Sequence, residues 1–551
     1  MRRIGDPHIE GRSWPAERAA ETLPRLRRAN DAEGIRAFVE ANPLATWYGC
    51  VPASLRVILD GVGPSAQGPA TVTSALRAFV NGRDPLLRAV PGEPLAQPPS
   101  ADPPRSPHSA LERPESPAGA ERGADADGFA PELVWPELLS AIRRRLLGHP
   151  RDAAARLTAL HHRFPALTAA FDLTGGVAAF AALEQGNAQM LAGDFTGALV
   201  TFHRVFGTPL SAHPYLLRDA RAKAALLHAL YGDVEQAASH LDIARQIPRT
   251  ESWAESFIDA ITATVEALLG PAEESLDWLN RIPAHHLGAM WPFHAAALFN
   301  VYSRAGRFHE MAVRLAVKTA ARTVAEQPEG IAGSAMPLTM ARLMLASGEM
   351  AVARTHLERA DPELVLTRLT SAQLSVAAGQ PREALRELSR LRADTLNFRR
   401  LDVARAAALA ASLIQLGEFA QARREATRAD QDWGGLSEAE IAGFPPAIQE
   451  FLSTARAEVS RGGGFGALPG TGPDIPPKLT KREREVLVHL TTGSSRKLIA
   501  NALYVSENTV KTHQRSLFKK LGVATRSEAI AVAARMGLIA PASEGSPEAD
   551  R

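Results

Sequence analysis

The 551-residue chain has little cysteine and no long apolar run. Its one cysteine, Cys50, cannot form an intrachain disulfide or a zinc site built from cysteines. A membrane-spanning helix needs about 18 or more consecutive apolar residues, and no such run occurs. Residues 1–15 also lack the apolar core of a signal peptide. We therefore expect a cytoplasmic protein with no membrane partner.

Short motifs of common enzymes are also missing. The sequence contains no G-x-x-x-x-G-K-[ST], no H-E-x-x-H and no G-x-S-x-G. The histidine pairs at 161–162 and 285–286 are adjacent on helical segments, so the two rings of each pair point apart. Residues 125–128 resemble part of a calcium loop, but the remaining ligand spacing fails. We expect no catalytic residue, no cofactor and no metal.

Positive charge is concentrated near the C-terminus. Residues 479–540 contain eleven lysines and arginines against four glutamates, a net charge of +7, whereas the whole chain carries only +2. The remainder of the protein is therefore acidic, at −5. A basic segment in an otherwise acidic chain is typical of a nucleic-acid interface.

Helix start and stop signals divide the basic segment into four helices. Thr480 and Glu483 form a capping box for the first, and Thr525 and Glu528 form one for the fourth. Serines precede the second and third helices, and glycines follow the first, third and fourth. The predicted helices begin near 481, 495, 507 and 526, with a tight turn over 504–508.

The third helix has two opposite faces. Val510, Gln514, Leu517 and Leu521 lie at helical spacing on one face. The other face is cationic, with short hydroxyl side chains beside it, and carries Lys511, Arg515, Lys519, Thr512 and Ser516. Lysine and arginine neutralise phosphates and reach guanine acceptors, and hydroxyl side chains can approach base edges. A merely solvated helix face is the alternative, but the short preceding helix and tight turn favour a DNA-reading helix.

These motifs resemble the LuxR-type helix-turn-helix domain over about 60 residues. The resemblance is carried by LTKREREVL, Gly493, IANAL, SENTVKTH, KKLGV and RSEAI. It implies a four-helix fold whose third helix enters the major groove and whose fourth makes a dimer contact. It places Lys511, Thr512 and Arg515 at the bases, and Asn508, Thr509, His513 and Lys519 near phosphates. It implies dimer contacts at Ile530, Ala533 and Gly537, and structural positions at Glu483, Leu487 and Gly493.

The second helix departs from the family pattern. Where the family usually has Asn followed by Lys-Glu, this chain has Arg496, Lys497 and Leu498. The added arginine and the lost acid make the helix more basic, so we expect Arg496 and Lys497 to contact phosphates. Leu498 removes any polar bond that the family makes there.

Two linkers separate the remaining regions. Residues 91–117 contain nine of the 39 prolines, and a polar run continues beyond them, so 91–130 is predicted to be disordered. Glycines and prolines over 461–477 predict a flexible tether to the 478–540 domain. Residues 541–551 are predicted to be a disordered tail. Residues 1–90 read as helical and have no assigned role.

Between the linkers the sequence repeats at 31 to 45 residues. A glycine is followed five positions later by a small residue and nine positions later by a bulky apolar one, each in seven of eight cases. The glycine allows a turn between helices, the small residue allows close approach, and the bulky residue fills the space between hairpins. The pattern resembles tetratricopeptide-like repeats and predicts a degenerate α-solenoid over 131–460, with an irregular helical bundle as the alternative. The glycines are Gly148, Gly193, Gly232, Gly270, Gly306, Gly348, Gly379 and Gly417.

The sequence thus predicts an all-α protein that binds double-stranded DNA as a homodimer and regulates transcription. The repeats would be the platform for an unknown small molecule or protein. Trp253, Trp278 and Trp291 could line a ligand groove there or be core residues. Two alternatives remain: an interaction scaffold with a vestigial DNA-binding domain, and an unrecognised enzyme in the repeats.

Overall fold

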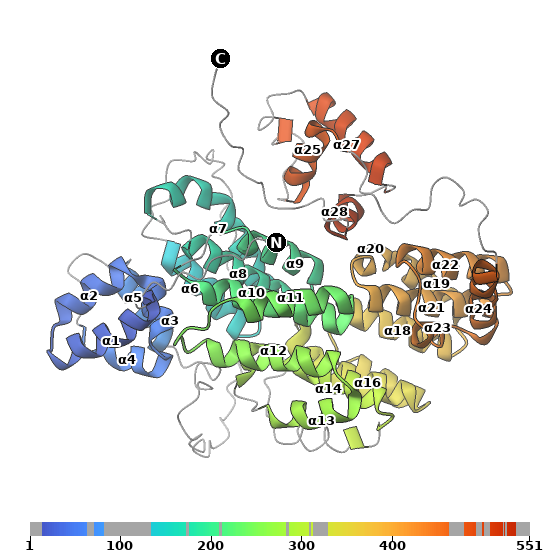
Figure 1. Cartoon of the computed structure of the whole chain (residues 1–551), viewed down its shortest axis with the longest axis horizontal. Coiled ribbons are helices and arrows are strands. Elements are labelled where there is room, and N and C mark those ends of the chain that lie inside the picture. Colours follow the sequence, from blue (N-terminus) through green and yellow to red (C-terminus); the bar gives the residue numbers. More distant parts are fainter. Residues whose placement is uncertain are drawn as a thin grey trace, which may run out of the picture.

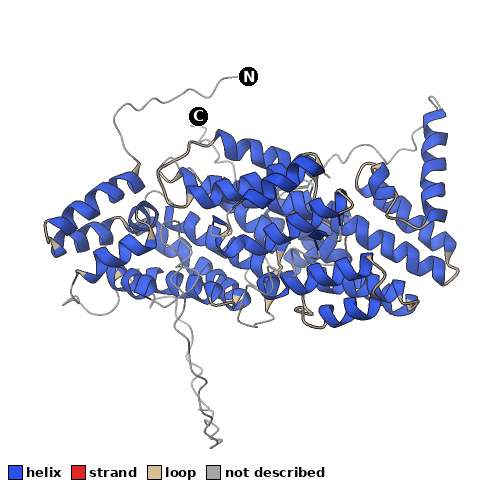
Figure 2. Ribbon diagram, turned by 90° about the horizontal axis from the view of Figure 1, so that it is seen from below, coloured by secondary structure: helices blue, strands red, loops and turns tan. Residues whose placement is uncertain are grey.

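Every element of the computed structural model is a helix, within the residues that it describes. Those residues are 14–62, 71–81, 134–171, 176–208, 212–282, 286–307, 310–311, 329–461, 479–491, 499–500, 507–521, 523 and 526–535. The all-α prediction is therefore confirmed (Figures 1 and 2). The predicted linker 91–130, nearly all of 461–477, and the tail 541–551 lie outside the described residues. Among the residues described, no helix is both long and apolar enough to cross a membrane.

Antiparallel helix pairs form the body of the molecule, and their turns fall at the predicted glycines. The body extends through the short helices η4 (Gly288–Met290), α20 (Arg392–Thr395) and α23 (Glu438–Ile441), and ends with α24 (Pro446–Arg461). Each pair contains two neighbouring helices in direct contact. The pairs are α6 (Val134–Leu146) with α7 (Pro150–Phe171), α8 (Gly176–Ala192) with α9 (Phe195–Phe206), α10 (Pro214–Tyr231) with α11 (Val234–Gln246), α12 (Glu255–Leu269) with α13 (Ala272–Arg281), α16 (Gly330–Ala346) with α17 (Met350–Leu357), α18 (Val365–Ala377) with α19 (Pro381–Arg390), and α21 (Arg399–Gln415) with α22 (Phe419–Asp432); α14 (Trp291–Arg304) ends at the remaining glycine turn.

The glycine turns use two backbone conformations. Six of the eight predicted glycines have positive φ, for example 86° at Gly193 and 81° at Gly417, a conformation that disfavours a side chain. At Gly417 no atom lies within 4 Å of the position a Cβ would take, so φ and not space requires glycine there. Gly232 and Gly270 also end helices but have φ of −108° and −82°. Positive φ therefore does not explain those two.

The small and bulky residues of the repeat pattern lie in the core. Every one of them that the structure describes is at most 8% exposed. Burial of the small residues is consistent with the close approach of paired helices that the spacing predicts. The small residues are Ala153, Ala198, Ala237, Ser275, Ala353, Ala384 and Ala422, and the bulky ones are Leu157, Phe202, Leu241, Leu279, Leu357 and Leu388.

The N-terminal helices pack onto the body through an aromatic cluster. They are α1 (Pro15–Arg28), α2 (Ala32–Ala41), α3 (Pro43–Gly49), α4 (Pro52–Asp60) and α5 (Val72–Asn81). Trp253 of the body donates from its indole N–H to the Trp47 carbonyl at 2.6 Å, and their rings lie 5.6 Å apart edge to face. Trp253 thus joins two regions of the chain, whereas Trp278 is 61% exposed.

A buried ion pair fixes the short helix α20. Arg405 and Asp402 are each 1% exposed at the side chain and bond at 2.6 Å. Arg405 Nε also donates to the Thr395 hydroxyl at 3.1 Å, and the Trp433 indole donates to Asp402 at 3.1 Å. Burial alone would raise the pKa of Asp402, but Arg405 and these bonds lower it below its usual value. The last residue of α20 is therefore held by a fully bonded buried network.

We expect Asp402→Ala to destabilise the body by about 3–5 kcal/mol, because it leaves the Arg405 charge buried without a partner. The double substitution Asp402→Leu with Arg405→Met should cost much less, since both charges are removed. Urea unfolding followed by circular dichroism measures both, with Glu273→Ala at an exposed pair as the matched control. Equal losses in Asp402→Ala and in the control would contradict this role of the pair.

Candidate nucleic-acid interface

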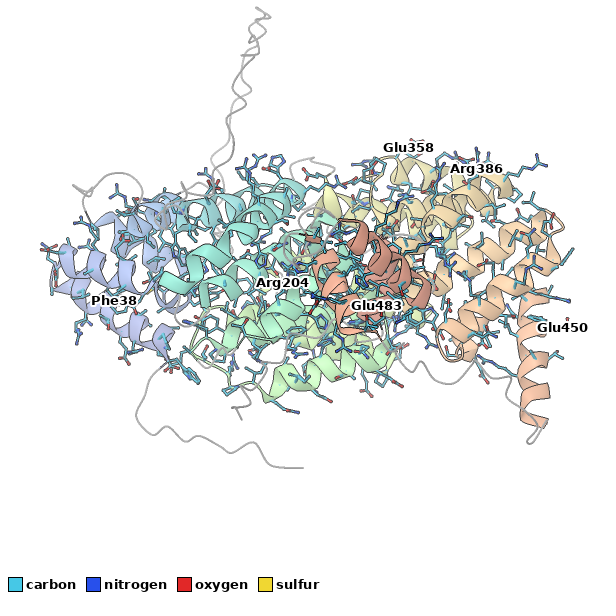
Figure 3. The ribbon with its side chains drawn as sticks, turned by 90° about the horizontal axis from the view of Figure 1, so that it is seen from above. Phe38, Arg204, Glu358, Arg386, Glu450 and Glu483 are labelled. Carbon is cyan, nitrogen blue, oxygen red and sulfur yellow. The ribbon has the colours of Figure 1, made fainter. Side chains whose placement is uncertain are left out.

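The basic C-terminal segment folds into a small helical domain with its own apolar core. The described helices are α25 (Lys481–Thr491), α27 (Glu507–Leu521) and α28 (Arg526–Arg535). Of the predicted second helix only residues 499–500 are described, and both are buried. Seen from above in Figure 3, the domain lies over the middle of the body. Its core contains Leu479, Val486, Leu487, Leu490, Ile499, Ala500, Val510, Leu517, Leu521, Ala529, Val532 and Ala533.

The predicted capping box at the start of α25 is present and extends to α27. Thr480 N–H donates to Glu483 at 2.7 Å, and Glu483 N–H donates to the Thr480 hydroxyl at 3.2 Å. The same carboxylate accepts from the Ser516 hydroxyl at 2.7 Å and from Lys520 Nζ at 2.6 Å. Glu483 is only 3% exposed. Glu483 therefore caps α25 and also bonds α25 to α27.

These bonds determine the ionisation of Glu483. Burial favours the neutral acid and by itself raises the pKa. The hydrogen bonds from Lys520, Ser516 and Thr480 favour the carboxylate and outweigh burial, lowering the pKa to about 2. Glu483 is therefore charged at neutral pH, and the link between α25 and α27 is strongest in that state.

Helix α27 has the two faces that its sequence predicts. Val510 and Leu517 are fully buried, and Leu521 is 6% exposed. Lys511 and Arg515 are both exposed and lie four residues apart, so they project from the same side of the helix. The two cations thus form a positive edge on the solvent side of the domain.

The structure describes only some of the other residues that are predicted to contact DNA. His513 is half-buried. Ser516 donates its hydroxyl proton to Glu483 and keeps only acceptor capacity for another partner. The other positions lie outside the described residues or have side chains that do: Asn508, Thr509, Thr512, Lys519, Arg496 and Lys497. Their DNA contacts stay predictions.

Arg526 supplies a link that sequence reasoning missed. Its guanidinium donates to the Leu490 carbonyl through Nε at 3.1 Å and through Nη2 at 2.5 Å. That carbonyl is in the last turn of α25, where backbone acceptors lack helical partners. A basic residue opening α28 after the capping-box threonine was visible in the sequence, but no local pattern gives its distant acceptor.

The predicted dimer positions lie on or near α28, which rests against the body. Helices α28 and α20 are in contact, and Figure 1 shows α28 between the other helices of the domain and the body. Ala533 has no exposed surface, so it cannot meet a second chain in this arrangement. Ile530 is half-buried and faces a cavity, and Gly537 lies outside the described residues.

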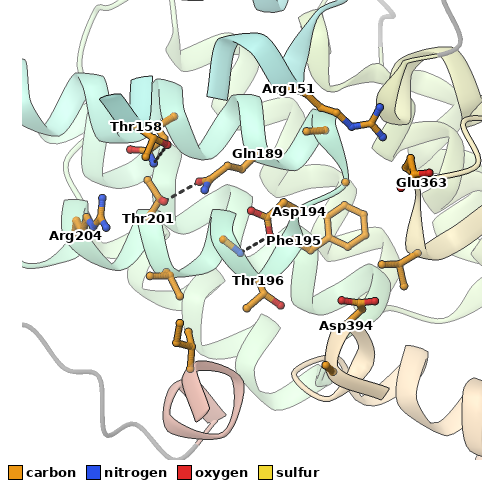
Figure 4. Close-up of a pocket in the computed structure, with 18 of the residues that line it drawn as sticks. Arg151, Thr158, Gln189, Asp194, Phe195, Thr196, Thr201, Arg204, Glu363 and Asp394 are labelled. Atoms are coloured by element: carbon orange, nitrogen blue, oxygen red, sulfur yellow. Dashed lines mark hydrogen bonds between the residues drawn. The ribbon is translucent and has the colours of Figure 1, made fainter. Parts of the chain in front are cut away.

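The cavity beneath Ile530 has a volume of about 650 Å³. Helices α7, α8 and α9 line one side, and residues around α18 and α20 line the other (Figure 4). Its lining contains three arginines and three acids: Arg151, Arg204, Arg368, Asp194, Glu363 and Asp394. The cavity therefore has charged groups within a mixed polar and apolar lining, is partly open to solvent, and is bordered by the C-terminal domain.

Two polar groups in the cavity lack partners among the described residues. Gln185 is 4% exposed and donates to the Thr158 hydroxyl at 3.0 Å, but its buried Oε1 accepts no bond. The Arg204 guanidinium has no acid partner among the residues described, and burial lowers its pKa. Burial also raises the pKa of Asp394, where repulsion from Asp194 works against the attraction of Arg368. A ligand with an anionic group and a hydrogen-bond donor would satisfy both unpartnered groups.

Comparison with known proteins identifies the C-terminal domain. A family model described as "Bacterial regulatory proteins, luxR family" matches residues 477–533. The chain is 48% identical over 61 residues to the spore germination protein GerE of Bacillus subtilis, a match that covers 82% of GerE and 11% of this chain. This chain belongs to the luxR family of bacterial regulatory proteins. Its C-terminal domain is thus a DNA-binding domain of transcriptional regulators.

Other luxR-family relatives are matched over smaller shares of their length. The chain is 44% identical over 78 residues to the probable transcriptional regulatory protein NarL of Mycobacterium tuberculosis, covering 36% of that protein and 14% of this chain. It is 45% identical over 71 residues to the HTH-type transcriptional regulator MalT of Yersinia pestis, covering 8% of MalT and 12% of this chain. No solved structure matches the chain, and the tetratricopeptide-like character of the body stays a prediction.

We expect acid to loosen the luxR-family domain through Glu483. Because its pKa is about 2 in the folded protein, against 4.5 ordinarily, its contribution is complete above about pH 4.5 and is lost as the pH falls toward 2. Glu483→Gln should cost about 1–3 kcal/mol near neutral pH and abolish that part of the pH dependence. Hydrogen exchange of peptides from 479–535, corrected for intrinsic rates, measures both effects.

Glu485→Gln is the matched control, because Glu485 pairs with Arg482 at the surface of the same helix. Its effect should be small. If the two substitutions changed protection equally at every pH, Glu483 would not hold α25 to α27.

Proposed function

We propose that this protein regulates transcription by placing α27 in the major groove of specific double-stranded DNA sites. The observation that carries the proposal is the exposure of Lys511 and Arg515 on one side of a helix whose other side is buried. Long cations on such an edge can reach guanine acceptors and the flanking phosphates. Both side chains are exposed to solvent.

Within this proposal the side chains divide into two groups. Lys511, Thr512 and Arg515 contact base edges and give sequence preference. The phosphate contacts position the domain and come from Asn508, Thr509, His513, Lys519, Arg496 and Lys497. Ser516 acts mainly by holding Glu483, because its proton is already donated there.

The protein would act on DNA as a homodimer. Pairing through α28, with Ile530 and Gly537 at the contact and Ala533 buried in the domain core, would place two copies of α27 in successive major grooves. The DNA site would then be an imperfect inverted repeat with half-sites about one helical turn apart.

The body would act as the sensor, and the 650 Å³ cavity supports this part of the proposal. The unpartnered Arg204 and Gln185 Oε1 favour a small ligand that carries an anionic group and an N–H or O–H donor. The cavity borders the luxR-family domain through Ile530, so its occupancy can influence that domain.

We expect Lys511→Ala and Arg515→Ala each to weaken specific binding by about 1–3 kcal/mol and to relax base preference at one position of each half-site. Sites are first selected from native genomic fragments with the full-length protein, and affinities are then measured by fluorescence anisotropy at several salt concentrations. Lys519→Ala should mainly lower the salt dependence, because it removes a phosphate contact.

Arg484→Ala is the matched control, since Arg484 is an exposed cation of the same domain outside α27. It changes net charge equally and should leave base preference intact. If the wild-type chain bound no duplex in a salt-sensitive way, the result would instead support an interaction scaffold whose DNA-binding domain is vestigial.

A further inference from the structure

Two of the three arginines that line the cavity of about 650 Å³ are neutralised by acids that do not line it. Arg151 Nη2 lies 2.7 Å from Asp361, and Arg368 Nε donates to Glu387 at 2.5 Å. Arg204 is the arginine of the lining for which the described residues supply no acid. The positive charge that the cavity offers a ligand is therefore on the α9 side.

Acids that are poorly neutralised lie at the other end of the cavity. Glu363 is exposed and has no basic partner among the described residues. Asp394 lies 3.5 Å from Arg368, whose guanidinium is already bonded to Glu387. Figure 4 shows Arg204 at one end of the cavity and Glu363 and Asp394 at the other. The cavity therefore presents separated charges of opposite sign.

Two glutamines of α8 add complementary hydrogen-bonding groups. Gln185 and Gln189 are four residues apart, so they project from the same side of the helix, and both line the cavity. The NH2 group of Gln185 is bonded, whereas its buried Oε1 accepts no bond among the described residues. Gln189 Oε1 accepts from the Thr201 hydroxyl at 2.7 Å, so its NH2 group remains as the donor. One amide thus offers an acceptor and the other a donor, and Gln189 lies between the two charged ends in Figure 4.

We propose that the cavity binds a short peptide with free ends, its terminal carboxylate on Arg204 and its terminal ammonium toward Glu363 and Asp394. The inference rests on the proposed function, because it names the ligand class of the sensor site. Guanidinium and carboxylate groups bind the opposite charge through charge-assisted hydrogen bonds. The two glutamines bind the N–H and C=O groups of the peptide between its ends. The cavity volume of about 650 Å³ falls within the range of roughly 300–1,000 Å³ that is typical of small-ligand sites.

Simpler ligands satisfy only part of this arrangement. A purely anionic ligand would pair with Arg204 and would be repelled by Glu363 and Asp394. A free amino acid carries both charges, but on one carbon atom, so it cannot reach groups at opposite ends of the cavity. Apolar members of the lining, such as Phe195 and Ile530, can contact the side chains of a peptide. A peptide is therefore the ligand that uses the charged, amide and apolar groups together.

Binding of defined peptide pools to the full-length protein tests the proposal without DNA. Three pools of random tetrapeptides are compared: one with free ends, one acetylated at the amine and one amidated at the carboxylate. Each pool is mixed with the protein, unbound peptide is removed by gel filtration, and mass spectrometry identifies the peptides that are retained. Retained sequences are then synthesised in all three forms, and calorimetry gives the Kd of each.

Peptides with free ends should bind about tenfold more tightly than either blocked form, because each block removes one charge-assisted contact. Equal binding of the three forms would overturn the proposal, and so would a protein that retains no peptide from any pool. This comparison uses the wild-type chain alone, so it does not depend on whether a variant folds.

Substitutions at the two ends assign each contact. Arg204→Met should abolish the preference for a free carboxylate over its amide and keep the preference for a free amine. Glu363→Gln combined with Asp394→Asn should have the reverse effect. Arg156→Met is the matched control, because Arg156 belongs to α7, pairs with Asp152 and does not line the cavity, so both preferences should remain. Circular dichroism melting verifies that each variant is folded.

Peptide binding and DNA binding fail separately in this design. If folded Arg204→Met protein lost affinity equally for all three peptide forms, Arg204 would not hold the carboxylate and the proposal would be overturned. A wild-type chain that prefers free-ended peptides but binds no duplex would refute the proposed function and leave the peptide site supported. Selective duplex binding without any preference among the peptide forms would do the opposite.

Discussion

The carboxylate of Glu483 is the interaction on which the geometry of the DNA-binding domain depends. It closes the start of α25 through Thr480 and accepts bonds from Ser516 and Lys520 of α27. Because both acceptor oxygens are occupied, the rotation of α27 about its own axis is restricted. The apolar side of α27 then faces the core, and Lys511 and Arg515 must face outward. One buried acid therefore sets where the positive edge points.

Ion pairs organise the body in a comparable way. Arg145 of α6 bonds Glu184 of α8 across 39 residues, and Arg218 of α10 bonds Glu255 of α12 across 37. Both separations are close to one repeat, so each pair joins the first helices of consecutive hairpins. Removing such charges from water is costly, and their net contribution to stability is small. We infer that they mainly select one alignment of neighbouring hairpins among the many that alanine-rich surfaces would accept.

Features that depend on residues close together in the chain, such as helix ends and buried helix faces, could be predicted from the sequence. The eight glycines lie at helix ends, six of them with positive φ, and the small and bulky residues that follow them are buried where the structure describes them. The capping box at Thr480 and the buried side of α27 follow from spacing in the same way. Contacts between distant segments could not be predicted: Arg526 on the Leu490 carbonyl, Trp253 on Trp47, and Leu396 in the C-terminal core. Each depends on packing that no short window encodes.

The position of Leu396 gives the body a direct contact with the core of the C-terminal domain. A contact that buries little surface shifts an equilibrium only when the competing state is nearly equal in free energy. The cavity adjoins this contact, because Ile530 of α28 lines it together with Arg204 and Gln185 of the body. The contact with the body lies on α28, whereas Lys511 and Arg515 lie on α27, so the body and the exposed cations meet different helices of the domain.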